Sequence, residues 1–131
     1  MSLSIQETTN QNSEKVVFVV DDDEHIGLLI TQLIQQETPH KAWHHTTGGK
    51  ALEALSLHTP HLFILDYELP DMNGLELHDQ LHKFDSLRDV PTLLISAMKP
   101  PLRELRKRAI TFLAKPFDLT ELLHTISRLL T

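Results

Sequence analysis

The stretch HLFILDYELPDMNG, residues 61–74, decides the fold class of this chain. Four apolar residues, 62–65, are followed directly by Asp66 and then by the turn-forming residues Pro70, Asp71, Asn73 and Gly74. A short apolar run that ends in such residues is typical of a strand buried on both faces, as in a parallel sheet. We therefore expect Asp66 to lie at the carboxyl end of a buried strand.

Four more strands are expected around this one. Runs of β-branched and apolar residues predict strands at 16–20, 90–96 and 111–114, and residues 41–46 give a weaker signal. Apolar residues at helical spacing lie between and after these runs, and Asp118 has the position of an N-cap for the last helix. Strands that alternate with helices imply a doubly wound α/β fold, with a five-stranded parallel sheet and helices on both faces.

Composition limits the function classes. The 131 residues suit one domain, which we place at 15–131 after a flexible N-terminal segment, 1–14. The absence of cysteine excludes disulfide and thiolate chemistry, and no apolar run is long enough to cross a membrane, so a cytoplasmic protein is expected. A net charge of -6 argues against direct nucleic-acid binding.

The basic residues are unevenly distributed. Six of the twelve lie between Lys99 and Lys115, where Glu104 is the single acidic residue. The simpler interpretation is a solvated helix face, and the alternative is a surface on which a partner docks.

The nine histidines raise the question of a metal site. His78 and His82 have the i, i+4 spacing of a helical ligand pair, but we expect them on the solvent edge of the helix without a third ligand. His44 and His45 should point to opposite faces of their strand. The sequence therefore does not predict a histidine metal site.

Polar residues stand at the ends of four expected strands: Asp21 and Asp22, Asp66, Ser96, and Lys115. In a doubly wound fold these ends meet at the ligand-binding edge. Two ionised carboxylates about 4 Å apart repel by roughly 4 kcal/mol at an effective dielectric near 20, so a cation or a proton is expected there. Oxygen ligands alone suit Mg²⁺ before Ca²⁺. A hydroxyl and an ammonium group would complete a cradle for a phosphoryl group, which a carboxylate can accept as nucleophile.

Taken singly, these residues have simpler explanations. An acidic run that follows a strand often gathers negative charge at a helix N-terminus, where it is favourable. Ser96 could be a cap, and Lys115 a surface charge. Their combination is what gives the pattern its specificity.

The combination resembles a known family. The blocks VVFVVDDDEHI, LFILDYELPDMNGLEL, TLLISA and FLAKPFDLTELL are similar, in order and over residues 15–130, to the four signature blocks of the receiver domain of two-component response regulators. The intervals from Asp21 to Asp66 and from Asp66 to Ser96 match as well. The resemblance implies a flavodoxin-like fold of strand order 2-1-3-4-5, for which a member of this family is a standard example. It also implies a phosphorylation-dependent switch.

The resemblance assigns the chemistry residue by residue. Asp66 would accept a phosphoryl group from a phosphohistidine on a histidine kinase or a phosphotransfer protein. Asp21, Asp22 and Asp66, with the backbone carbonyl of Glu68, would hold Mg²⁺.

The switching residues are implied in the same way. Ser96 would be the hydroxyl that moves to bond the phosphoryl group, Lys115 the cation that pairs with it, and Phe112 the aromatic switch residue. The bond from Lys115 to Pro116 is expected to be cis.

One segment departs from the family pattern. The interval from Ser96 to Lys115 is shorter than usual, and residues 106–110, RKRAI, replace a small Ala-Gly segment. Because Pro100 and Pro101 also stiffen its entry, we expect the fourth helix to be short or displaced. This segment is normally the output face, so switching and dimerisation are the properties expected to differ.

Three function classes are compared. The first is the phosphoacceptor switch, which turns over no metabolite. The second is a non-phosphorylated pseudo-receiver that acts as a constitutive protein-interaction module. The third, a haloacid dehalogenase-like phosphatase, expects a second Asp where this chain has Glu68, and a cap region for which 131 residues leave little room. The sequence specifies neither the kinase, the downstream protein target nor the oligomeric state.

Overall fold

The computed structural model describes residues 14–131, so the expected N-terminal segment lies, apart from Glu14, outside the described residues. Five parallel strands form one sheet in the order β2-β1-β3-β4-β5. The strands are β1 Val16–Val20, β2 Lys41–His45, β3 Leu62–Asp66, β4 Thr92–Ser96 and β5 Thr111–Ala114. The predicted strand order and fold class are therefore confirmed.

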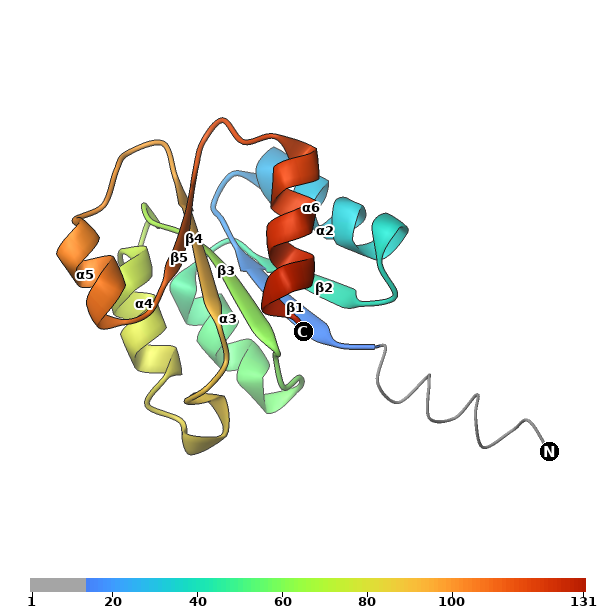
Figure 1. The fold of residues 1–131 in the computed structure, drawn as a ribbon. Coiled ribbons are helices and arrows are strands. Elements are labelled where there is room, and N and C mark those ends of the chain that lie inside the picture. Colours follow the sequence, from blue (N-terminus) through green and yellow to red (C-terminus); the bar gives the residue numbers. More distant parts are fainter. Residues whose placement is uncertain (1–13) are drawn as a thin grey trace.

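Within residues 14–131, five α-helices and two 3₁₀ turns connect or follow these strands. They are α2 Glu24–Glu37, α3 Gly48–Glu53, η1 Ala54–Ser56, α4 Gly74–Leu81, η2 Asp85–Leu87, α5 Leu102–Lys107 and α6 Leu119–Leu129. Figure 1 shows α2 and α6 over one face of the sheet and α3, α4 and α5 over the other. The sheet is thus the middle one of three layers.

Each face of the sheet has its own apolar core. On one side, alternate residues of β1 and β3, such as Val19 and Ile64, pack with Ile30 of α2 and Ile126 of α6. On the other side, Phe18 and its neighbours pack with residues of α3, α4 and α5. Every residue of β3 and β4 is buried, which explains their continuous apolar runs.

The edge strand β2 explains the weaker sequence signal at 41–46. It is exposed at Lys41 and Trp43, and Trp43 is stacked on His58 with ring centroids 4.4 Å apart. The two histidines of β2 do face opposite sides. The ring of His44 covers Gly27 of α2, whereas His45 contacts Phe18 on the other face.

Two predictions about helix ends can be compared with the structure. Asp118 accepts hydrogen bonds from Thr120 and Glu121 at the start of α6, which confirms the predicted N-cap. Helix α5 has six residues and no side-chain N-cap, so the prediction of a short fourth helix is also confirmed. It ends at Lys107, and Ala109, two residues further on, has a φ of 55°, in the left-handed region that glycine usually occupies.

Candidate functional site

Asp66 occupies the carboxyl end of the central strand β3 and is 7% exposed. The parallel register places the other strand ends beside it. Asp21 follows β1 directly and is fully buried, and Ser96, also fully buried, ends β4 next to Ile95, the register partner of Asp66. The sheet therefore brings together the strand-end residues on which the sequence prediction depended.

Lys115 joins two of these carboxylates. Its Nζ atom donates to Oδ2 of Asp21 over 3.0 Å and to Oδ2 of Asp66 over 3.3 Å. The lysine follows β5, and its backbone N–H donates to the carbonyl of Ser96 over 2.8 Å. The peptide bond from Lys115 to Pro116 is cis, as expected. A single ammonium group thus partly neutralises two buried carboxylates.

Burial and the charge of Asp21 raise the pKa of Asp66 from 3.8 to about 6. The ammonium group of Lys115 and the backbone N–H of Glu68 act in the opposite direction, and do not outweigh them. For Lys115, burial alone would lower the pKa, but the hydrogen bond and charge of Asp21, with the charge of Asp66, raise it. The lysine therefore remains an ammonium group at neutral pH.

The three aspartates have the composition of a site for a hard cation. One carboxylate oxygen each from Asp21, Asp22 and Asp66 lies within 4.8 Å of the others, and Asp22 is exposed at the mouth of the site. Oxygen donors with an open, solvent-accessible side suit Mg²⁺, which keeps several water ligands. The donor set therefore fits the ion that the sequence implied.

The backbone next to Asp66 belongs to the same site. Glu68 N–H donates to Oδ1 of Asp66 over 3.2 Å, and Glu68 forms an isolated antiparallel bridge with Asn73. This contact fixes the start of the loop that joins β3 to α4. It places Glu68, the expected carbonyl ligand, beside the carboxylate cluster.

The two expected switch residues lie on neighbouring strands. Ser96 is on the sheet edge that carries Asp66, and its Oγ accepts a hydrogen bond from the backbone of Met98 over 3.0 Å. Phe112 of β5 is half-buried and packs against the core on the α3, α4 and α5 side. Its register partner is Leu94 of β4. The structure thus gives the hydroxyl a partner within its own loop.

Two contacts of the aspartate cluster were not predicted. The backbone N–H of Asp23 donates to Oδ1 of Asp21 over 2.9 Å, and Nε2 of His44 lies 2.7 Å from the carbonyl oxygen of Asp21. The strand alternation predicted only that His44 and His45 face opposite sides of the sheet, and Gly27 is the residue whose missing side chain makes room for the ring of His44. Sequence position alone did not link this ring to Asp21.

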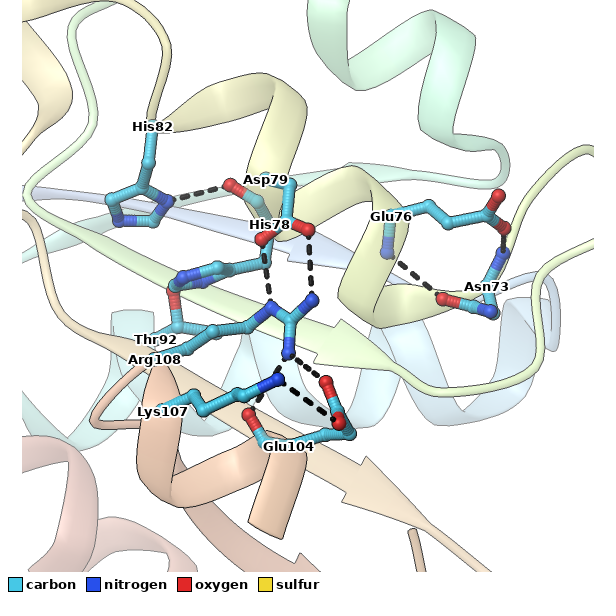
Figure 2. Close-up of polar contacts among 9 residues, drawn as sticks. All are labelled: Asn73, Glu76, His78, Asp79, His82, Thr92, Glu104, Lys107 and Arg108. Atoms are coloured by element: carbon cyan, nitrogen blue, oxygen red, sulfur yellow. Dashed lines mark hydrogen bonds and ion pairs between the residues drawn. The ribbon is translucent and has the colours of Figure 1, made fainter. Parts of the chain in front are cut away.

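The prediction that His78 and His82 lie on a solvent edge was wrong for His78. His78 is 7% exposed, and its Nδ1 lies 2.8 Å from the hydroxyl of Thr92 on β4. One ring nitrogen of His82 lies 2.7 Å from the carbonyl oxygen of His78 (Figure 2). The other lies 2.8 Å from the carbonyl oxygen of Val90. Burial lowers the pKa of His78 to about 4. The two rings therefore pack α4 against β4 and fix the position of the carboxyl end of α4.

The basic segment is divided between two roles. Arg108 turns inward and donates to both carboxylate oxygens of Asp79 on α4, over 2.7 and 2.9 Å (Figure 2). It also donates to the carboxylate and the backbone carbonyl of Glu104. By contrast, Arg103 and Arg106 are exposed. The solvated-face interpretation therefore fits most of α5, whereas Arg108 fastens α5 to α4.

Comparison with known proteins agrees with this fold. The family model of the response regulator receiver domain matches residues 17–127. The chain therefore belongs to the response regulator receiver domain family, and its class is that of two-component signalling proteins. None of the helices within residues 14–131 combines the length and apolar character needed to span a membrane.

Curated relatives differ in how much of their length the chain covers. It is 31% identical to the transcriptional regulatory protein CrdR of Helicobacter pylori and 32% identical to the cyclic di-GMP phosphodiesterase response regulator RpfG of Xanthomonas campestris, with 88% and 98% of the chain aligned. It spans 54% and 36% of those proteins. By contrast, it spans 93% of the polar-differentiation response regulator DivK of Brucella anthropi, at 29% identity over 86% of the chain.

Solved structures give the same fold. The Vibrio cholerae chemotaxis protein CheY4 superposes with a TM-score of 0.82 at 23% identity, covering 89% of this chain and 99% of that one. The non-phosphorylated HemR receiver domain of Leptospira biflexa has a TM-score of 0.79 at 27% identity, covering 89% and 94%.

Proposed function

We propose that this domain is a phosphorylation-dependent switch of a two-component or phosphorelay system, and that Asp66 accepts the phosphoryl group from a phosphohistidine on a histidine kinase or a phosphotransfer protein. The observation that carries this proposal is the position of Asp66. It is a buried carboxylate at the end of the central strand, close to a second buried carboxylate, and shares one lysine with it. The two carboxylates carry more negative charge than the single lysine neutralises, so further positive charge is favourable at this site.

The proposed transfer forms one bond and breaks one. An oxygen of the ionised Asp66 attacks the phosphorus, the P–O bond forms as the P–N bond to the donor imidazole breaks, and the imidazole leaves with its bonding electron pair and takes up a proton. Lys115 already lies 3.3 Å from Asp66, so it can pair with a phosphoryl oxygen after small movements. Asp21, Asp22, Asp66 and the Glu68 carbonyl would hold Mg²⁺, which would supply positive charge to the phosphoryl oxygens.

The proposed signal is a change in charge and hydrogen bonding at the sheet edge. Phosphorylation adds about -1.5 to -2 charge at Asp66. Ser96 then exchanges its bond with the Met98 backbone for a bond with the phosphoryl group, and Phe112 on the adjoining strand adjusts with the loop. The exposed surface of α5 is where a downstream protein reads the change. The domain acts as a two-state switch and turns over no metabolite.

The surroundings of Lys115 support docking of a phosphodonor protein, an encounter that we place in the cytoplasm as part of this proposal. A groove of about 410 Å³ adjoins the lysine and is lined mainly by apolar residues: Ile26, Leu29, Ala97, Pro116, Phe117 and Leu119. A protein that presents a phosphohistidine could bury apolar surface in this groove, while its phosphoryl group reaches Asp66.

The test is acid-labile phosphorylation on incubation with acetyl phosphate and Mg²⁺. Wild type is expected to take up one phosphoryl group, and Asp66→Asn none. Asp85→Asn, which removes an exposed carboxylate from η2, is the matched control and should label like wild type. If wild type takes up no phosphoryl group, the proposed phosphorylation switch is refuted, and the constitutive interaction module becomes the better-supported function. The observation that favours that second candidate is the attachment of the short α5 to α4 by Arg108.

A further inference from the structure

The loop that follows Asp66 is tied to a separate helix by Asp71. Oδ1 of Asp71 accepts a hydrogen bond from the backbone N–H of Gly48 over 3.0 Å, and Oδ2 accepts one from Gly49 over 2.9 Å. Both glycines belong to the first turn of α3, which follows the edge strand β2. One carboxylate thus connects the loop between β3 and α4 to the connection between β2 and α3.

Helix α3 has a cap of its own besides Asp71. Thr47 is its N-cap residue, and its Oγ1 accepts from the backbone N–H of Lys50 over 3.0 Å. The hydroxyl therefore satisfies one early amide from within the helix, and Asp71 satisfies two from outside. Although desolvation acts the other way, the hydrogen bonds from Gly49 and Gly48 lower the pKa of Asp71, so its ionised form is the one that the contact stabilises.

The absence of a side chain at Gly48 makes this close approach possible. A Cβ atom there would lie 2.7 Å from Sδ of Met72, the residue after Asp71. A side chain there would have to displace the side chain of Met72. Gly48 therefore lets the side chain of Met72 lie against the first turn of α3.

The tied loop is the one that leads from the phosphoryl site. At its start, Glu68 N–H donates to Asp66. At its end, the N–H of Gly74 donates to the carbonyl of Tyr67 over 2.7 Å, and a Cβ at Gly74 would lie 2.6 Å from the carbonyl oxygen of Asp66. The loop is thus closed at its base, and Asp71 anchors its outer turn to α3.

We propose that Asp71 is a positioning residue for the Mg²⁺ site, acting through the loop that presents the backbone carbonyl of Glu68. The inference rests on the proposed function, in which that carbonyl is a ligand. Without the two bonds to α3, the loop has more conformations available, and fewer of them place the carbonyl beside Asp21 and Asp66. Loss of groups that orient metal ligands typically lowers metal affinity about 10- to 100-fold.

The experiment is calorimetric titration of the phosphate-free domain with MgCl₂. Asp71→Ala is expected to bind Mg²⁺ about tenfold more weakly than wild type, and Asp71→Asn, which keeps one acceptor oxygen, to fall between them. The matched control is Thr47→Ala, which removes a cap from the same helix without touching the loop, and should bind like wild type. Circular dichroism of each variant establishes that it is folded.

A kinetic measurement separates positioning from general damage. With acetyl phosphate as donor, Asp71→Ala should need about tenfold more Mg²⁺ for its half-maximal rate, while its rate at saturating Mg²⁺ approaches that of wild type. Equal Mg²⁺ affinities of Asp71→Ala and wild type would overturn the inference, as would an equal loss in Thr47→Ala. If wild type itself binds no Mg²⁺, the proposed function fails first.

Discussion

Replacement of Asp66 by asparagine should stabilise the Mg²⁺-free domain at pH 8. The carboxylate is 7% exposed, and its pKa is raised by burial and by Asp21 from 3.8 to about 6. In the folded state, ionisation of Asp66 is therefore harder than in the unfolded chain. Asparagine keeps nearly the same shape and removes the charge.

The sign of the effect follows from the direction of the pKa shift. Because the folded pKa lies above the unfolded value, the ionised form is disfavoured by folding, and its cost is absent below about pH 4. The cost develops as pH rises from about 4 to about 6 and is constant above. A shift from 3.8 to about 6 corresponds to about 3 kcal/mol. Water at the mouth of the site screens part of it, so we expect about 2 kcal/mol.

Urea unfolding in EDTA at pH 8 and pH 4 measures this difference. Asp66→Asn should be about 2 kcal/mol more stable than wild type at pH 8, and equal to it at pH 4. The control is Asp85→Asn, which removes the same charge from a side chain that is 91% exposed; it should change stability by less than about 0.5 kcal/mol. The reasoning is refuted if Asp66→Asn is no more stable at pH 8, or if its advantage is as large at pH 4.

Three further changes test other parts of the structure. Lys115→Ala should still bind Mg²⁺ but lose the phosphorylation-dependent change in hydrogen exchange of α5; unchanged coupling would count against its role. Arg108→Ala should lower the free energy of unfolding by about 1 kcal/mol, because its bidentate pair with Asp79 is lost. Lys107→Ala, which removes a longer contact of 3.6 Å with Glu104, should lower the free energy of unfolding clearly less. Equal losses in the two variants would contradict the attachment of α5 to α4 by Arg108. His45→Phe should raise the free energy of unfolding, measured in urea at neutral pH, by about 1 kcal/mol, because the buried Nε2 of His45 has no hydrogen-bond partner among the described residues. Burial lowers the pKa of His45 to about 4, so wild type loses stability as pH falls from 6.5 towards 4, and the variant should lose less; a parallel pH profile would contradict this.

Most of the fold was predictable because the three central strands of the sheet are buried on both faces. The run Val16–Val20 was placed without error at both ends, and Thr111–Ala114 likewise. The expected strand at 90–96 began two residues too early, since Val90 and Pro91 precede β4. The site was predictable for a related reason: parallel strands in register align their carboxyl ends, so the residues after four strands had to meet.

The rest depended on contacts between residues far apart in the sequence. The i, i+4 spacing of His78 and His82 shows that they are neighbours on a helix, but not that Thr92 of β4 provides a buried partner for His78. In the same way, the basic segment gave no sign that Arg108 turns towards α4, because its partner Asp79 lies on another helix. Asp71 reads locally as a turn residue, and its bonds to α3 appear only in three dimensions.

The most direct test of the central claim is to locate the phosphorylated residue. Wild type is incubated with acetyl phosphate and Mg²⁺, the aspartyl phosphate is reduced with borohydride, which converts it to homoserine, and the peptides are sequenced by mass spectrometry. We predict homoserine at position 66 and nowhere else, and none when Mg²⁺ is removed with EDTA. Homoserine at Asp21 or Asp22, or its absence from every peptide, would contradict the assignment of Asp66 as the phosphoryl acceptor.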